Sequence, residues 1–282
     1  MKALVLAGGF GTRLRPLTYT VPKCLLPVNN ITILEHQVAM LSACDEIFLA
    51  TNYLEDRIRE FLSKTDLGHV VVNHEDTPLG TGGAVLNARE LLGDSFVVLN
   101  GDIVSDCRPE TLAAGAHKSV SCVLATVPVP DVSRYGRIEE KDGRVTSFSE
   151  KEASNHTPGR INAGIYYCTK KVFSFIPDEG PSSLERDVFP RLAEKGLLAS
   201  HAHEGIWHDV GTRESYIEAN CTLSKTAYVS APDACVEESD ISHSVILSGA
   251  TVRHATITNS VIGFGARVEN DVVENAIVAK KG

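Results

Sequence analysis

The sequence contains no long hydrophobic run and no excess of positive charge. No segment approaches the about 20 consecutive apolar residues that a membrane-spanning helix needs, so a membrane is not an expected partner. The 282 residues carry a formal net charge of −9 and no basic stripe, which disfavours nucleic acid as a partner. A highly anionic small substrate remains compatible with this composition, because a local group of cations can overcome a weakly negative overall field.

Cysteine pairs with metal-binding or redox spacing are also absent. The seven cysteines show no C-x-x-C spacing, and they stand at Cys24, Cys44, Cys107, Cys122, Cys168, Cys221 and Cys235. This irregular set predicts reduced thiols that mostly fill the core, and it argues against a disulfide framework or a zinc site. The first apolar strand is expected within two or three residues of the start of the sequence. That leaves no room for a signal peptide and predicts a cytoplasmic protein.

Both common nucleotide-binding fingerprints are missing as well. The dinucleotide pattern G-x-G-x-x-G and the P-loop pattern G-x-x-x-x-G-K-[ST] do not occur. Instead, an apolar strand over 3–7 runs into the glycine-rich segment Gly8-Gly9-Phe10-Gly11-Thr12-Arg13, followed by Arg15 and Lys23. Glycines let backbone N–H groups approach phosphate oxygens, and the cations add donors and charge. The segment therefore predicts a polyphosphate site, although such a turn on its own is often only structural.

The order of apolar and amphipathic segments predicts an α/β fold. Buried strands are expected at 3–6, 46–51, 69–73, 96–99, 121–127 and 163–167, and helices at 33–43, 54–62, 83–92 and 182–198. Strands that alternate with helices over the first hundred residues indicate a mostly parallel sheet with covered faces. Asp142-Gly143 marks a β-hairpin, and Ser182 is expected to begin a capping box with Glu185.

The C-terminal part carries an internal repeat. Residues 244–252 and 260–268 match at six of nine positions, with glycine where turns are expected. This pattern favours the rungs of a short β-helix over a few antiparallel surface strands. We expect one domain over 1–224, followed over 225–282 by a linker, at 225–233, and the repeat. A single rung exposes an apolar face unless it is covered, so we also expect a homo-oligomer that associates through this tail.

Two aspartates are candidates for a metal site. Asp102 ends the apolar run 96–100 in Asn-Gly-Asp, and Asp209 follows Trp207-His208. Ligands of open α/β sheets lie beyond the carboxyl ends of strands, where Asp102 is expected. Two carboxylates beside a triphosphate suit Mg²⁺, with phosphate oxygens and water completing its shell. Taken alone, Asp102 could equally be a turn residue, since Asn-Gly-Asp is good turn chemistry.

Two further segments carry polar residues that suit a sugar or a base. Glu150-Lys151 is followed by Arg160-Ile-Asn-Ala-Gly164, where a lysine can neutralise a phosphate and Glu150 and Asn162 can bind sugar hydroxyls. In isolation the Glu-Lys pair is more often a solvated surface pair. The loop over 75–84, Glu-Asp-Thr-Pro-Leu-Gly-Thr-Gly-Gly-Ala, allows a flat ligand such as a base to approach the backbone closely, and it also makes an ordinary loop before a helix.

Taken together, these motifs resemble those of the sugar-1-phosphate nucleotidyltransferases. The matching pieces follow the family's order over 1–220 and comprise 8–18 with Pro22-Lys23, 78–82, 100–102, 150–151, 161–164 and 207–211. The tail resembles the left-handed β-helix that many members append. The resemblance implies a Rossmann-like, mostly parallel sheet for the first domain. One departure is Cys24, where the family usually has proline after the lysine.

The resemblance also implies a role for each matching residue. Nucleotide binding falls to Leu6, Ala7, Gly8, Gly9, Gly11, Thr12, Arg13, Gly80, Thr81 and Gly101. The sugar phosphate is assigned to Gly136, Glu150, Lys151, Asn162 and Gly164. The catalytic residues would be Arg13, Lys23, Asp102 and Asp209, with both aspartates binding Mg²⁺.

The implied reaction is attack of a sugar 1-phosphate oxygen on the α-phosphorus of a nucleoside triphosphate, with release of pyrophosphate. Because the nucleophile is already ionised at neutral pH, positioning and charge neutralisation suffice. The segments 78–82, 132–136 and 160–166 look most like those of mannose-1-phosphate guanylyltransferases. Heptose-phosphate guanylyltransferases share much of this pattern, and glucose-1-phosphate thymidylyl- and uridylyltransferases are further off. A non-catalytic nucleotide-sugar-binding homologue is the rival from another class, with a nicotinamide oxidoreductase a distant third.

Overall fold

The structure is a computed structural model that describes residues 1–116, 119–133, 135, 137–149 and 156–280. The chain forms two compact units, each assembled from two separate stretches of sequence. The first unit comprises residues 1–9 and 37–207, and the second comprises residues 10–36 and 208–282. The helix α1 (Ile33–Met40) crosses the boundary between them. The domain limits expected at residues 224 and 225 stay a prediction.

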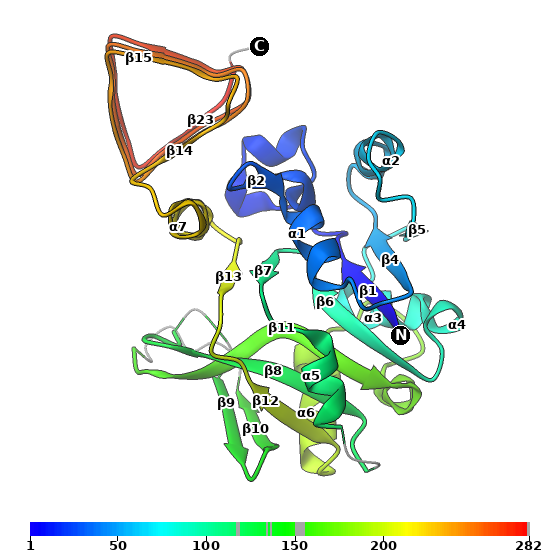
Figure 1. The fold of residues 1–282 in the computed structure, drawn as a ribbon. Helices are drawn as coiled ribbons and strands as arrows, with labels where there is room; N and C mark the ends of the chain where they lie inside the picture. The colour runs from blue at the N-terminus through cyan, green and yellow to red at the C-terminus, as the bar shows by residue number, and fades with distance from the viewer. Residues whose placement is uncertain (117–118, 134, 136, 150–155, 281–282) are drawn as a thin grey trace. The chain divides into compact units, whose positions relative to one another are not determined.

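A nine-stranded sheet forms the core of the first unit, in the order β5-β4-β1-β6-β11-β8-β12-β10-β9. Its strands are β1 (Lys2–Leu6), β4 (Glu46–Thr51), β5 (Val70–His74), β6 (Ser95–Asn100), β8 (Cys122–Val129), β9 (Arg137–Lys141), β10 (Arg144–Ser149), β11 (Gly159–Thr169) and β12 (Leu198–Ala202). The strands β5, β4, β1 and β6 run parallel, whereas β11 is antiparallel to both β6 and β8. The parallel arrangement predicted for the first hundred residues is thus present, and the later strands form a mixed sheet (Figure 1).

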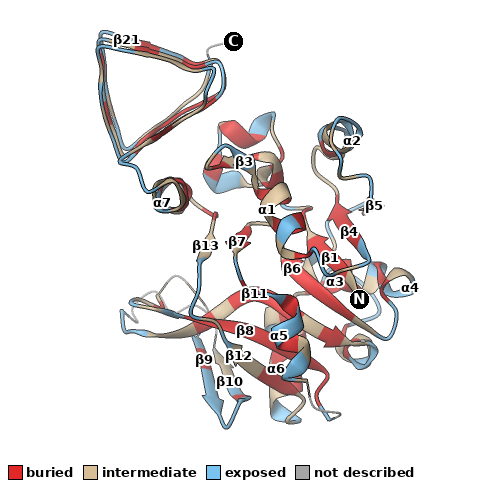
Figure 2. Cartoon of the chain, in the orientation of Figure 1, coloured by how far each residue is buried: buried red, intermediate tan, exposed pale blue. Residues whose placement is uncertain are grey.

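Short helices connect these strands. They are α2 (Glu55–Ser63), α3 (Gly80–Asn87), α4 (Arg89–Leu92), α5 (Pro109–Ala114) and α6 (Phe189–Glu194), with further helical turns at Lys170–Phe175 and Leu184–Val188. Two short strands, β7 (Ile103–Ser105) and β13 (Trp207–Asp209), lie outside the large sheet. Aromatic side chains fill the interior, where Tyr166, Phe96 and Phe189 are fully buried. Figure 2 shows buried residues along the central strands β1, β6 and β8.

Several predictions of local structure can be checked in the first unit. The hairpin is confirmed, since Arg144 pairs with Lys141 across a turn in which Asp142 and Gly143 both have positive φ. The expected helix over 83–92 begins earlier, at Gly80, and is interrupted at Ala88. The capping box was assigned to the wrong residue: Ser183, not Ser182, caps the following helical turn by accepting a hydrogen bond from the amide of Arg186. The Ser182 hydroxyl has no hydrogen-bond partner within the described residues.

The second unit contains the glycine-rich segment from Phe10 onwards, one longer helix and the repeat. Three tight helical turns at Thr12–Leu14, Leu17–Tyr19 and Lys23–Leu25 precede the small hairpin of β2 (Pro27–Val28) and β3 (Ile31–Thr32). The helix α7 (Arg213–Ser224) has Thr212 as its N-cap, and Thr212 and Ser215 form a reciprocal capping box. The Asn220 side chain accepts a hydrogen bond from the Asn29 amide at 2.8 Å, which ties α7 to this hairpin.

The repeat forms a three-sided parallel β-helix, which decides against antiparallel surface strands. One sheet contains β14 (Val229–Ser230), β17 (Val245–Ile246), β20 (Val261–Ile262) and β23 (Ile277–Val278). The others contain β15 (Cys235–Glu237), β18 (Thr251–Arg253) and β21 (Arg267–Glu269), and β16 (Asp240–Ser242), β19 (Thr256–Thr258) and β22 (Val272–Glu274). All these pairings are parallel, and Figure 1 shows the triangular cross-section. The arrangement is consistent with a left-handed β-helix. Its first strand lies inside the stretch over 225–233 that the sequence had suggested as a linker.

Equivalent positions of the β-helix recur every 16 residues, as in the pairing of Val245 with Val261 and of Val261 with Ile277. Buried aliphatic side chains such as Val252, Ile257 and Ile262 fill its interior. At the corners the backbone adopts positive φ, which glycine and asparagine tolerate best. Stacking of each rung on the next buries apolar faces that a single rung would expose.

The described part of the chain contains no helix long and apolar enough to span a membrane.

Removal of one buried side chain should measure how much the interior of the β-helix contributes to stability. Ile257 is fully buried, so Ile257→Ala should lower the free energy of unfolding by about 2–4 kcal/mol through lost burial and the cavity left behind. Val272 on the neighbouring strand β22 is 63% exposed, so Val272→Ala should change stability by less than about 0.5 kcal/mol. Urea denaturation of both variants checks this, and equal losses would contradict the described packing.

Candidate active site

The carboxyl ends of the central parallel strands are in register in the first unit. Leu6, at the end of β1, pairs with Ala50 of β4 on one side and with Asn100 of β6 on the other. Just beyond the strand, the Ala7 amide donates to the Ala50 carbonyl at 2.9 Å. This alignment brings the residues that follow each strand to one edge of the sheet, where ligands of such sheets bind.

Gly101 shows how closely this edge is packed. Its amide donates to the Leu6 carbonyl at 3.1 Å, and a Cβ atom at this position would lie 2.4 Å from that same oxygen. No side chain fits there, so glycine is required for the turn between Asn100 and Asp102 to reach β1. The resemblance assigned Gly101 to the nucleotide. In the structure, the absence of a side chain on Gly101 also allows the turn to pack against the end of β1.

Gln37 holds the same turn from the opposite side. Its side-chain amide donates to the carbonyls of Asn100 and Ile103, both at 3.0 Å, and the residue is 1% exposed. The two carbonyls flank Gly101 and Asp102, so one buried side chain fixes both ends of the segment that carries the candidate carboxylate. The sequence analysis did not identify Gln37. The only signal was a polar residue within an otherwise apolar helical face.

Glu75 is a buried acid at the end of β5. It is 5% exposed, and its Oε2 atom lies 3.7 Å from the position that a Cβ atom on Gly8 would occupy. Desolvation by burial raises the pKa of this carboxyl group, an effect that the Leu79 amide and the nearby His74 only partly offset. Burial of an acid next to the glycine-rich segment is costly, which makes Glu75 a functional candidate. The sequence analysis quoted Glu75 within its loop but gave it no role.

The loop at the start of α3 packs closely on residues 182–184. Gly80 has a φ of +73°, and a Cβ atom there would lie 2.4 Å from the Ser182 carbonyl oxygen. The Thr81 hydroxyl donates to Glu185 at 2.8 Å and accepts from the Leu184 amide at 2.8 Å. Because its single proton is donated to Glu185, the Thr81 hydroxyl has no proton left to donate to a base.

A hydrogen-bonded network joins this loop to β11. The Tyr166 hydroxyl accepts from Asn162 at 2.7 Å and donates to Glu185 at 3.3 Å. Glu185 in turn accepts from Thr81. Burial raises the pKa of Tyr166 well above its usual value, so the phenol stays a donor. Two candidate residues from separate motifs, Thr81 and Asn162, therefore belong to one network through side chains that the sequence analysis assigned to no site.

The shape of β11 explains where Asn162 lies. The pairing of β11 with β8 shifts register between Asn162 and Tyr166, and bulges of this kind re-aim side chains next to active sites. Within the bulge, the Asn162 side chain accepts from the Gly164 amide at 2.9 Å. Gly164 has a φ of +73°, and a Cβ atom there would lie 2.8 Å from the side chain of Asn100. Asn162 and Gly164, two of the five residues predicted for the sugar phosphate, are thus locally constrained.

In the second unit the glycine-rich segment folds back on itself. Gly11 has a φ of +58°, and its carbonyl accepts from the Thr18 hydroxyl at 2.8 Å. A Cβ atom on Gly11 would lie 2.9 Å from the Thr18 methyl group and 3.4 Å from the Lys23 Cβ. The turn therefore brings the backbone of Lys23 next to Gly11. Cys24, the departure from the family pattern, is buried, and burial raises the pKa of its thiol to about 12, so it is an inert side chain.

The same unit brings Arg13 and Asp209 to one place. A Cβ atom on Gly211 would lie 2.8 Å from the Asp209 carboxylate and 3.0 Å from the Arg13 guanidinium. Gly211 thus leaves room for two functional groups that are almost 200 residues apart in sequence. Asp209 and Asp102 both offer hard oxygen ligands that suit Mg²⁺. Neither aspartate belongs to a group of three or more metal-ligating side chains among the described residues.

The predicted site residues are distributed over both units. The first unit holds Leu6, Ala7, Gly8, Gly9, Gly80, Thr81, Gly101, Asp102, Asn162 and Gly164, and the second holds Gly11, Thr12, Arg13, Lys23 and Asp209. Gly136, Glu150 and Lys151 lie outside the described residues. No measurement tests the individual assignments, which therefore stay predictions.

The fold and these motifs define an α/β protein in which a glycine-rich, cation-bearing segment follows the first strand. The chain belongs to the nucleotidyl transferase family, whose model matches residues 2–226. The fold class and the family predicted from the sequence are therefore confirmed, and the chain is an enzyme of the nucleotidyltransferase class.

Relatives of established name are numerous, and two illustrate the range. A mannose-1-phosphate guanyltransferase of Yarrowia lipolytica is 36% identical over 252 residues, which cover 85% of this chain and 69% of the relative. A probable mannose-1-phosphate guanylyltransferase of Arabidopsis thaliana is 38% identical, over 77% of this chain and 63% of its own length. The chain thus spans about two thirds of the length of these relatives.

Solved structures agree on the fold. HddC from Yersinia pseudotuberculosis, complexed with GMP-PN, has a TM-score of 0.69 at 28% identity over 79% of this chain and 99% of that one. A putative glucose-1-phosphate thymidylyltransferase from Bacillus anthracis, in complex with a sucrose, has a TM-score of 0.70 at 28% identity over 80% of this chain and 96% of that one.

Replacement of Gln37 should separate positioning from folding. Gln37→Leu removes both donors to the carbonyls that flank Asp102, so turnover should fall about 100-fold because the turn is no longer fixed. The buried carbonyls left without a partner should also cost about 1–3 kcal/mol of stability each. Steady-state pyrophosphate release and thermal unfolding measure the two effects. Met40→Leu on the same helix should keep its turnover, and a Gln37→Leu enzyme with wild-type kcat would contradict the role.

Proposed function

We propose that the chain transfers a guanylyl group from GTP to mannose 1-phosphate and releases pyrophosphate. The family supports the nucleotidyl transfer, and the names of the sequence relatives support the two substrates. Buried Glu75 beside the glycine-rich segment is the structural observation on which the choice of base rests.

On this proposal the triphosphate binds at the segment over 8–13. Backbone amides near Gly8 and Gly11 approach the phosphate oxygens, and Arg13 supplies a forked pair of donors. Lys23, whose backbone the turn brings beside Gly11, places its charge at the α-phosphate, where negative charge develops during transfer. Phosphate binding of this kind needs cations and amides but no histidine or serine nucleophile.

The acceptor would be held by residues of β11 and of the segment before it. We assign Asn162 and Gly164 to the sugar phosphate, together with Gly136, Glu150 and Lys151 from the sequence pattern. An oxygen of the acceptor phosphate forms a bond to the α-phosphorus in line, while the bond from that phosphorus to the β-phosphate oxygen breaks. The acceptor is already ionised at neutral pH, so no side chain has to remove a proton, and orientation carries the catalysis.

Asp102 and Asp209 would hold Mg²⁺, because both present hard oxygen ligands and the fold restrains both segments. When bound, such an ion screens the charge of the phosphates and orients them. Gln37 fixes the turn of Asp102, and the space left by Gly211 keeps the Asp209 carboxylate next to Arg13.

The base assignment follows from the chemistry of a buried carboxylate. An ionised carboxylate offers two acceptors and no donor. Guanine presents two adjacent donors, the N1–H and the 2-amino group, which match this pair. Adenine offers no donor at N1, and uracil and thymine offer only a single ring N–H. A buried acceptor pair that is left partly unsatisfied rejects the wrong base strongly, as polar binding sites generally do.

Self-association through the β-helix and a cytoplasmic location remain predictions from the sequence.

Asp102→Asn should test the reaction. The change keeps the size of the side chain but removes its charge, so pyrophosphate release should fall by orders of magnitude while the melting temperature stays near wild type. Asp106→Asn is the matched control, because this carboxylate lies four residues further on, is 55% exposed, and should leave turnover nearly unchanged. Near-normal pyrophosphate release by Asp102→Asn would overturn the metal assignment.

Glu75→Gln should change the choice of base. The wild-type enzyme should prefer GTP over ITP, which lacks the 2-amino group, by about 10- to 100-fold in kcat/KM, the value of one charge-assisted hydrogen bond. The variant should lose most of that preference. The control Asp76→Asn alters the neighbouring carboxylate, which is fully exposed, and should keep the preference. An unchanged GTP-to-ITP ratio in Glu75→Gln would exclude Glu75 as the base reader.

Glu75 should also make the KM for GTP depend on pH. Burial raises the pKa of Glu75, so the carboxylate takes up a proton at a higher pH than an exposed glutamate does. The KM for GTP should therefore rise as the pH falls towards that raised pKa. Glu75→Gln, which does not titrate, should remove this rise.

A further inference from the structure

The β-helix contacts segments that carry candidate catalytic residues. The segment over 10–36, which includes Arg13 and Lys23, and the segment over 208–224, which includes Asp209, belong to the same compact unit as the β-helix. The contacts lie at two separate corners of the β-helix, at Gly263 and at Asn275, and involve both backbone and side chains. A tail that served only self-association would not require these contacts.

The first contact reaches the glycine-rich segment through Leu17. A Cβ atom on Gly263, in the β-helix, would lie 2.9 Å from a methyl group of Leu17 and 2.8 Å from the Val278 carbonyl. Leu17 is 4% exposed, so it is packed against this glycine without space to spare. The next residue, Thr18, donates to the Gly11 carbonyl. One continuous path of close contacts therefore runs from the rung to the turn that precedes Arg13.

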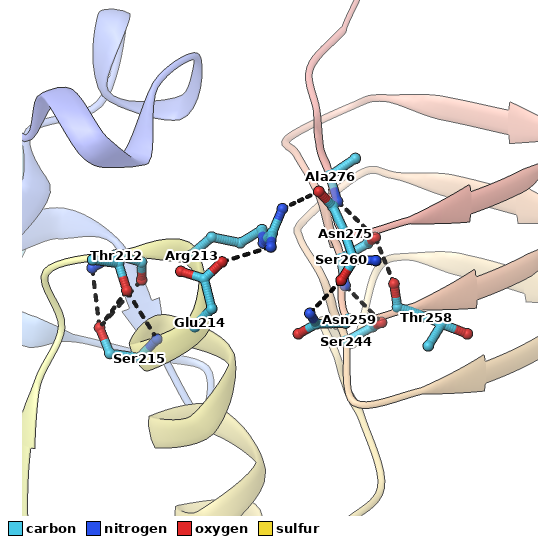
Figure 3. Close-up of polar contacts among 10 residues, drawn as sticks. All are labelled: Thr212, Arg213, Glu214, Ser215, Ser244, Thr258, Asn259, Ser260, Asn275 and Ala276. Atoms are coloured by element: carbon cyan, nitrogen blue, oxygen red, sulfur yellow. Dashed lines mark hydrogen bonds and ion pairs between the residues drawn. The ribbon is translucent and has the colours of Figure 1, made fainter. Parts of the chain in front are cut away.

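The second contact reaches the segment of Asp209 through Arg213 (Figure 3). The Arg213 guanidinium donates to the Asn275 carbonyl at a corner of the last rung and pairs with Glu214 at 2.5 Å. Arg213 is the first residue of α7 and follows the N-cap Thr212. The capping box keeps Gly211 fixed as well, since the Gly211 amide donates to the Ser215 hydroxyl at 3.1 Å.

The corner that receives Arg213 is rigid. Buried serines stack along it: the Ser260 amide donates to the Ser244 hydroxyl, and the Ala276 amide donates to the Ser260 hydroxyl, each at 3.1 Å (Figure 3). Asn259 donates to the side chain of Asn275 at 2.6 Å. Each rung is thus hydrogen-bonded to the next at the position where the helix α7 is attached.

We propose that the β-helix positions the triphosphate-binding half of the active site, with Leu17 and Arg213 as the positioning residues. Leu17 fixes the turn that precedes Arg13, and Arg213 fixes the segment that places Asp209 and Gly211 beside the Arg13 guanidinium. This inference rests on the proposed binding of a triphosphate by Arg13. It gives the tail a role within one chain, independent of any second copy.

The experiment removes each contact and measures binding without turnover. Arg213→Met and Leu17→Ala should each raise the Kd of a non-hydrolysable GTP analogue, measured by calorimetry with EDTA present, by about tenfold, as misplacement of a positioning contact does. Hydrogen exchange of the backbone should accelerate at residues 9–19 in Leu17→Ala and at residues 208–215 in Arg213→Met. Thermal unfolding confirms that each variant is folded at the temperature used.

Two controls separate positioning from loss of charge or of stability. Arg253→Met removes an arginine that pairs with Glu237 inside the β-helix, and Ile257→Ala opens a cavity in its interior. Both should bind the analogue with wild-type affinity. Wild-type affinity and exchange in Leu17→Ala and Arg213→Met would overturn the inference, and so would equal weakening in the controls.

Failure of the proposed function can be distinguished from failure of this inference. A wild-type protein that does not bind the analogue would exclude triphosphate binding. The exchange measurements would still test whether the β-helix holds the segments of Arg13 and Asp209 in place. Faster backbone hydrogen exchange that is confined to the segment next to each substitution supports this positioning role, and unchanged hydrogen exchange overturns it.

Discussion

The central strand β1 and its backbone hydrogen bonds to both neighbours are the constraint on which the first unit depends. These bonds continue one residue past the strand, from Ala7 to β4 and from Gly101 back to Leu6. Because parallel strands in register end at the same level, the loops after β1, β4, β5 and β6 meet at one edge. A shift of β1 by one residue would move its own loop out of line with those of its neighbours and would exchange the side chains that it buries on its two faces.

The enzyme combines a negative overall charge with a local excess of cationic side chains in one short segment. The chain carries a net charge of −9, yet the glycine-rich segment contains Arg13 and Arg15 and is followed by Lys23. A polyanionic substrate is therefore recognised by short-range geometry and not by the field of the whole molecule.

Features that depend on one continuous stretch of sequence could be predicted. Contacts between residues far apart in the sequence could not. The strand ends, the hairpin at Asp142-Gly143 and the 16-residue repeat follow from local chemistry and periodicity. Gln37 escaped notice because its importance depends on two carbonyls more than 60 residues away. Likewise, Glu185 and Tyr166 join Thr81 to Asn162 only in the folded chain. The cap was placed one residue early because the capping-box spacing pairs Ser182 with Glu185, whereas the folded backbone makes Ser183 the cap although Arg186 follows it at that spacing.

The period of 16 residues has a consequence for how this tail can vary. A rung adds one complete turn, so an insertion or deletion of any other length would rotate every later side chain to a different side of the triangle. Asn275 would then no longer face Arg213. The tail can therefore change in length only by whole rungs, or only beyond the corner that Arg213 contacts.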